Sequence, residues 1–228
     1  MKAAQAGSGR KPAYYQDVRR MLDKTPLDAV SVATCNHTHT LISLWALQAG
    51  KHVYVEKPLS HNVREGTYLA AVAKATGLVV QHGTQGRSSA GLQDMIRFLR
   101  SEELGPLTAV RGFCYKRRTS IGISQESPVP SGVDHDLWLG PAPERPYAPN
   151  RFHYNWHWYW DYGNGDIGNQ GVHEMDRARW GLGATAHPKR ILSVGGRLGY
   201  EDSGETPNTS ISYFDYGTVP FVFEVRGL

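Results

Sequence analysis

The sequence predicts an α/β chain in which a parallel sheet covered by helices precedes an α+β region with a mostly antiparallel, open sheet. Up to about position 100, short apolar runs alternate with amphipathic stretches, and strand–helix repeats with short connections build parallel sheets. A polar turn at 102–106 is followed by one long strand, a helix and three more strands. We therefore expect two domains, at 1–105 and 106–228.

In the first region, local signals mark where the elements begin and end. Asn62 can cap a helix that stops at Gly77, because asparagine accepts backbone N–H bonds and glycine tolerates positive φ. The run at 28–34 is apolar at successive positions, which favours a strand buried on both faces. The expected strands are 13–15, 28–34, 52–55 and 78–82, and the expected helices are 17–24, 39–49, 63–76 and 88 or 89 to about 100.

The second region is expected to hold strands at 107–115, 190–197, 209–214 and 221–225, and a helix near 166–180. A loop rich in proline and glycine fills 122–150 and leads into an aromatic run at 153–162. Aromatic rings stack on sugar faces, but they also build cores and subunit contacts. Both uses of this run stay open, as does a metal site at His153, His157 and Asp161.

Composition narrows the function classes. The chain is 40% hydrophobic and 20% charged, which is typical of a globular protein with a core. Its net charge of +4 is scattered, so we expect no nucleic-acid partner. No run approaches the length of a membrane span, and two cysteines are too few for a disulfide scaffold or a four-ligand zinc site. We expect no bound metal and no membrane contact, and we expect a cytoplasmic protein.

Two segments carry specific motifs. The first lies within residues 28–58 and contains DAVSVATCNHTH at 28–39 and AGKHVYVEKP at 49–58; the second is GNGDIGNQGVHEMD at 163–176. A Glu-Lys-Pro element follows a predicted strand, and an Asx-x-x-x-His pattern lies on a predicted helix downstream. Together they resemble the signature motifs of the glucose–fructose oxidoreductase / inositol dehydrogenase / MocA (Gfo/Idh/MocA) family. The resemblance implies an incomplete Rossmann domain, and activity with NAD or NADP on a secondary hydroxyl or carbonyl group of a sugar or polyol. It also implies a homo-oligomer in the full-length form.

The sequence departs from the family pattern at three places. Cys35 stands where the family has proline, and Asn169 stands where it has aspartate; an amide can orient a hydroxyl but cannot carry a proton. The G-x-G-x-x-G phosphate loop is missing, and Gly7-Ser8-Gly9 is its only echo. We therefore expect weakened dinucleotide binding. Our hypothesis is that the chain is an internal segment or a mis-started reading of a longer enzyme, and that it lacks the glycine-rich part and the C-terminal end.

The resemblance assigns roles to particular residues. Lys57 follows a strand, where open α/β sheets bind ligands, and would relay a proton, which His173 would share. Asp166 and Asn169 lie on the same helix face as His173 and would orient the substrate. The other expected substrate residues are Arg87 and Trp160. The expected cofactor residues are Thr34, Asn36, His39, Glu56 and Lys57.

Each assignment has a structural alternative. Lys57 and Arg87 could be ordinary solvated side chains, and His173 a buried structural histidine. Thr34 or Asn36 could simply cap a helix. Two functional alternatives also stay open: an NAD-assisted glycoside hydrolase of the same family, and a non-catalytic truncated relative.

Overall fold

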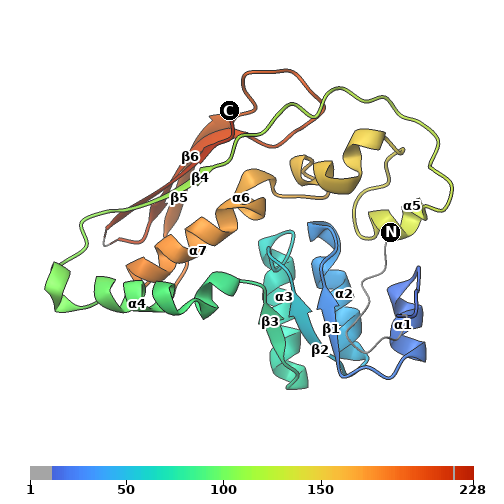
Figure 1. Ribbon diagram of the computed structural model, residues 1–228, viewed down its shortest axis with the longest axis horizontal. Helices are drawn as coiled ribbons and strands as arrows, with labels where there is room; N and C mark the ends of the chain where they lie inside the picture. The colour runs from blue at the N-terminus through green and yellow to red at the C-terminus, as the bar shows by residue number, and fades with distance from the viewer. Residues whose placement is uncertain (1–11, 218) are drawn as a thin grey trace.

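The computed structural model describes residues 12–217 and 219–228, and Figure 1 shows two sheets joined by helices. The Gly7-Ser8-Gly9 motif lies outside these residues. The first sheet has the strand order β1-β2-β3, and the second has the order β4-β7-β6-β5. The predicted fold class is confirmed, while the domain boundary between 105 and 106 stays a prediction.

The first sheet is parallel throughout. It consists of β1 (Ala29–Val32), β2 (His52–Val55) and β3 (Val80–His82), with α1 (Val18–Lys24), α2 (Asn36–Gln48) and α3 (Val63–Thr76) beside it. Its core is formed by alternate strand residues packed against α2 and α3. The buried members are Leu22, Val30, Val32, Ala46, Leu47, Val53, Val55 and Leu69.

Three expectations for this sheet need correction. Residues 13–15 do not form a strand; they line a cavity beside α1, and no strand of the described residues pairs with them. The strand at 28–34 is shorter than predicted, and only alternate residues are buried, so it is not covered on both faces. α2 begins at Asn36 rather than His39. By contrast, α3 has the predicted bounds: Asn62 caps it, and Gly77 ends it at φ 69°.

The second sheet is mixed but mostly antiparallel. Its strands are β4 (Val110–Tyr115), β5 (Arg190–Gly196), β6 (Thr209–Asp215) and β7 (Pro220–Arg226), and only the β4–β7 pair is parallel. Figure 1 shows α6 (Gly165–Asn169) and α7 (Gly171–Leu182) along one side of this sheet. The expected helix at 166–180 is therefore two helices, which meet at Gln170. Phe221 and Phe223 of β7 pack against α7.

The opposite face of this sheet is open. Several large apolar side chains are exposed on it, by strand register the face away from Phe221 and Phe223: Phe113, Tyr115, Leu192, Val194, Ile211 and Tyr213. Among the described helices, none combines the length and the apolar character that crossing a bilayer needs.

Short helices occupy the segment between β3 and β4 and the long connection that follows β4. α4 (Ala90–Leu99) follows the 3-10 helix η1 (Gln85–Ser88), and the short 3-10 helix η2 (Glu102–Leu104) lies beyond α4. The loop at 122–150 holds α5 (His135–Leu139) and reaches η3 (Pro149–Arg151), while η4 (His153–Trp158) covers much of the aromatic run. Within the described part of the chain, no group of three or more His, Cys, Asp or Glu residues is placed to hold a metal ion.

Candidate active site

Lys57 lies just after β2, at the carboxyl edge of the parallel sheet, and contacts the second half of the chain. Its Nζ donates to the backbone oxygen of Asn169 at 2.6 Å and to the Oδ1 of the same residue at 3.2 Å. The side chain is half-buried, and this burial lowers the pKa of the Lys57 ammonium. The site thus joins residues that are far apart in the sequence.

The Asn169 amide extends this contact into a network. Its Nδ2 donates to the hydroxyl of Tyr154 at 2.7 Å, and Arg118 donates to the same hydroxyl at 3.2 Å. Arg118 also forms a buried ion pair with Asp166 at 2.7 Å. The resemblance did not point to Tyr154 or Arg118. Their only sequence signals were the aromatic run and the short basic run at 116–118.

His173 lies on α7 and is half-buried. Burial, and next the nearby charge of Lys57, lower the pKa of its imidazole. The two predicted catalytic residues are therefore close enough for one charge to act on the other.

The other predicted substrate residues are bound to partners other than Lys57 or line a cavity elsewhere. Asp166 is 2% exposed, and its Oδ1 is held by Arg118. Arg87 donates to both carboxylate oxygens of Asp176, at 2.9 and 2.7 Å, and lies over the ring of Trp180. Trp160 lines a cavity between α6 and the strands β5 and β6, which is described below. Of the four predicted substrate residues, Asn169 is the one that hydrogen-bonds to Lys57 in the described part of the chain, and the roles of all four stay predictions.

Two of the predicted cofactor residues hold loops together. The ring nitrogens of His39 lie 2.7 Å from the Pro58 carbonyl oxygen and 3.0 Å from that of Thr34. Asn36 donates to the Oδ1 of Asn164 at 3.0 Å. Because both side chains are buried in these contacts, they position the loops after β1 and β2.

Glu56 and Thr34 are placed differently from these two. The backbone N–H of Lys57 donates to the Oε2 of Glu56 at 3.4 Å, so this carboxylate lies beside the lysine. Thr34 is exposed, and its hydroxyl accepts from Thr38 in the first turn of α2. Both side chains thus lie at the carboxyl edge of the first sheet.

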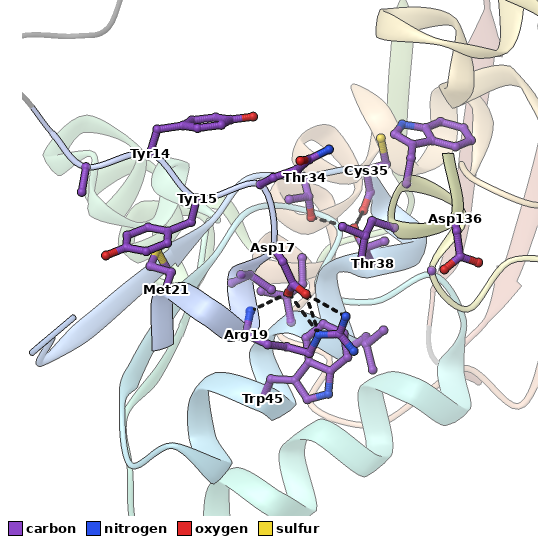
Figure 2. A pocket seen from close by; sticks show the side chains of 18 residues that line it. Tyr14, Tyr15, Asp17, Arg19, Met21, Thr34, Cys35, Thr38, Trp45 and Asp136 are labelled. Carbon is purple, nitrogen blue, oxygen red and sulfur yellow. Dashed lines mark hydrogen bonds and ion pairs between the residues drawn. The ribbon is translucent and has the colours of Figure 1, made fainter. Parts of the chain in front are cut away.

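A cavity of about 620 Å³ opens beside the end of β1. Figure 2 shows Thr34, Cys35 and Thr38 on one part of its wall and Tyr14, Tyr15, Met21 and Trp45 on others. Asp17 holds the guanidinium of Arg19 through several hydrogen bonds in the same view. Burial raises the pKa of the Cys35 thiol to about 12, so this cysteine stays protonated at neutral pH.

A parallel sheet with polar side chains at its carboxyl edge, contacted there by Asn169 of α6, defines an α/β protein of the class that binds ligands at the carboxyl ends of its strands. Residues 2–84 match the family model for the NAD-binding Rossmann fold of an oxidoreductase family, and residues 106–203 match the model for its C-terminal alpha/beta domain. The chain belongs to the Gfo/Idh/MocA oxidoreductase family.

Relatives include levoglucosan dehydrogenase of Pseudarthrobacter phenanthrenivorans, 24% identical over 211 residues, which cover 87% of this chain and 47% of the relative. The scyllo-inositol 2-dehydrogenase (NAD(+)) of Bacillus subtilis is 30% identical over 98 residues, or 43% of this chain and 29% of the relative. The chain spans less than half the length of these curated relatives.

Among solved structures, the WlbA dehydrogenase from Bordetella pertussis, in complex with NADH and UDP-GlcNAcA, has a TM-score of 0.70 at 18% identity. The match covers 94% of this chain and 53% of the WlbA chain. At this level of identity the likeness concerns the fold.

Proposed function

We propose that this protein is an NAD(P)-dependent oxidoreductase that interconverts a secondary hydroxyl and a carbonyl group on a sugar or polyol. The observation that carries the proposal is the position of Lys57. Its ammonium lies at the carboxyl edge of β2, is held by Asn169 of α6, and acts on the pKa of His173 of α7.

Lys57 has the properties of a proton-transfer group. Burial is the largest influence on the pKa of Lys57 and lowers it, although the charges of Tyr154 and Glu56 act in the opposite direction, so the neutral amine is easier to reach than that of a solvated lysine. A neutral amine can accept the hydroxyl proton as an alcohol is oxidised, and the ammonium can return a proton to a carbonyl oxygen. The half-buried imidazole of His173 would bind the same oxygen, and Asn169 would keep the lysine in place.

The cavity beside β1 fits one ring-bearing part of a dinucleotide. Its volume of about 620 Å³ lies in the range of small-molecule pockets, and its wall is largely aromatic and aliphatic. Thr34 and Cys35 would lie along the cofactor, with Glu56 near Lys57. The dinucleotide, when bound, takes up or supplies the hydride. The choice between NAD and NADP, and the expected weakening of binding, stay predictions.

The proposed substrate class follows the printed names of the relatives, which act on levoglucosan and scyllo-inositol. Assembly into a homo-oligomer and a cytoplasmic location also stay predictions. The open face of the second sheet, with its exposed apolar side chains, would be a suitable surface for such an assembly.

The test is a nicotinamide absorbance assay with scyllo-inositol, myo-inositol and levoglucosan, each with NAD and NADP. We expect turnover by the wild-type protein and a loss of about 10²–10⁴-fold in kcat for Lys57→Ala. Lys51→Ala is the matched control, because Lys51 lies at the opposite end of β2. Normal turnover by Lys57→Ala would contradict the proposal.

The same assay separates the two alternatives. Sugar released from a glycoside without a net change in nicotinamide absorbance would favour the NAD-assisted hydrolase. Sugar binding without dinucleotide binding, measured by calorimetry, would favour the non-catalytic relative. Either outcome would replace the proposed oxidoreductase activity.

A further inference from the structure

We propose that the protein has a second carbohydrate-binding site, separate from Lys57, which binds an uncharged sugar or polyol. The site is a cavity of about 350 Å³ between α6 and the strands β5 and β6, with Trp160 on its wall. This volume lies at the lower end of the range for small-molecule pockets and suits a single monosaccharide ring.

Trp160 offers a platform for a sugar. It is 53% exposed, although most of the aromatic run around it is packed inside, including Trp158, Tyr159 and Tyr162. Its backbone N–H donates to the Oε2 of Glu205 at 2.9 Å, which fixes the main chain and leaves the indole ring free. A large exposed aromatic side chain beside a cavity is typical of a binding site, because the ring provides apolar contact area on a rigid support.

The strands on the other wall present hydroxyl groups where a packed core would be apolar. Ser210 and Ser212 of β6 lie on the same sheet face as their partners Val225 and Phe223 of β7. The β7 residues pack as hydrophobic core, whereas the serines line the cavity. Ser193 of β5 pairs with Ser212, and their hydroxyl oxygens are 2.8 Å apart.

Gly195 of β5 opens this wall further. It is the strand partner of Ser210, so no side chain stands beside the Ser210 hydroxyl on that edge. A hydroxyl both donates and accepts hydrogen bonds, which matches the hydroxyl groups of a polyol.

Charge decides which sugars fit. Among the described lining residues there is no lysine or arginine, so a phosphate or carboxylate group would find no counter-ion on the wall. Asp166, the charged member of the described lining residues, adds a carboxylate to the wall. Its negative charge disfavours an anionic ligand, so the lining suits an uncharged sugar or polyol.

The site is distinct from the candidate active site, although both use α6. Asn169 at the end of α6 binds Lys57, whereas Gly165, Asp166 and Ile167 at its beginning line the second cavity. The proposal therefore does not depend on the oxidoreductase function, and it can be tested without dinucleotide or turnover.

The experiment is ligand-observed saturation-transfer NMR on the full chain without dinucleotide. The probes are methyl β-D-glucopyranoside and myo-inositol, with glucose 6-phosphate as the anionic comparison. We expect the two neutral probes to bind and the anionic sugar to bind at least about tenfold more weakly. No binding of either neutral probe, or equal binding of glucose 6-phosphate, would overturn the proposal.

Two variants locate the binding. Trp160→Ala removes the platform, and Ser193→Phe fills the cavity; we expect each to weaken binding about tenfold or more. Leu192→Phe is the matched control, because Leu192 is the neighbouring β5 residue and its side chain lies on the opposite sheet face. It should bind like the wild type.

Lys57→Ala separates the two sites and should retain the neutral sugars. The proposal fails if Trp160→Ala and Ser193→Phe bind like the wild type. It also fails if Lys57→Ala abolishes all binding, because the sugar would then occupy the candidate active site alone. Circular dichroism shows which variants are folded. If Trp160→Ala does not fold, the comparison of sugar binding by Ser193→Phe and by Leu192→Phe tests the proposed site.

Discussion

Replacing Asn169 with aspartate tests how the site controls its lysine. The amide Oδ1 accepts from the Lys57 Nζ at 3.2 Å, so Asn169→Asp would place a carboxylate oxygen against the ammonium. A negative charge at this distance stabilises the protonated amine. We therefore expect the pKa of Lys57, which burial now lowers, to rise in the variant.

Coulomb's law sets the size of this change. At 3.2 Å the attraction is about 5 kcal/mol for an effective dielectric constant of about 20, and about 1 kcal/mol in bulk water. One pKa unit corresponds to about 1.4 kcal/mol, so the rise in the Lys57 pKa would be about 4 units in the first case and about 1 unit in the second. Lys57 is only half-buried, and solvent screens the pair, so we expect a rise of about 1–2 units.

The assay is an NMR titration of the Lys57 side-chain resonance. This resonance is assigned by its absence from the spectrum of Lys57→Arg. Asn150→Asp is the control, because Asn150 binds Tyr159 and Gly122 instead of Lys57, and the pKa should hardly move. If the protein turns over as proposed, the pH at which activity rises should move upward with the pKa. An unchanged or lower Lys57 pKa in Asn169→Asp would refute the contact between the two side chains.

Two further predictions concern stability. Burial lowers the pKa of His157 to about 4, so between about pH 6.5 and 4 the unfolded state binds a proton that the folded state does not. As the pH falls through this range, the free energy of unfolding should decrease by up to about 3 kcal/mol. His157→Gln should flatten this pH dependence in denaturant titrations at several pH values. An identical pH slope in the variant would contradict it. Arg118→Met leaves the buried Asp166 carboxylate without its partner and should lower the free energy of unfolding, measured by chemical denaturation, by about 3–5 kcal/mol. The control Arg97→Met removes an exposed pair with Asp94 and should lower it by less than about 1 kcal/mol. Equal losses would show that the buried pair contributes no more to stability than the exposed one.

Local signals in the sequence determined much of the secondary structure. α3 has the predicted bounds because Asn62 and Gly77 act through hydrogen bonds and backbone angles within a few residues. The second sheet is mostly antiparallel, as the succession of one strand, a helix and three further strands led us to expect. The family motifs placed Lys57 at a strand end, where the structure has it.

The tertiary structure alone decided which side chains meet. Asn169 was expected near the substrate, but its bonds to Tyr154 and Lys57 join three segments whose spacing has no regular period. Trp160 was predicted to bind the same substrate as Lys57, but it lines the cavity between α6 and the strands β5 and β6. The aromatic run forms 3-10 turns rather than one regular helix, so helical spacing could not predict where each ring points. Periodicity and capping depend on neighbours in the chain, whereas a site depends on how distant elements pack.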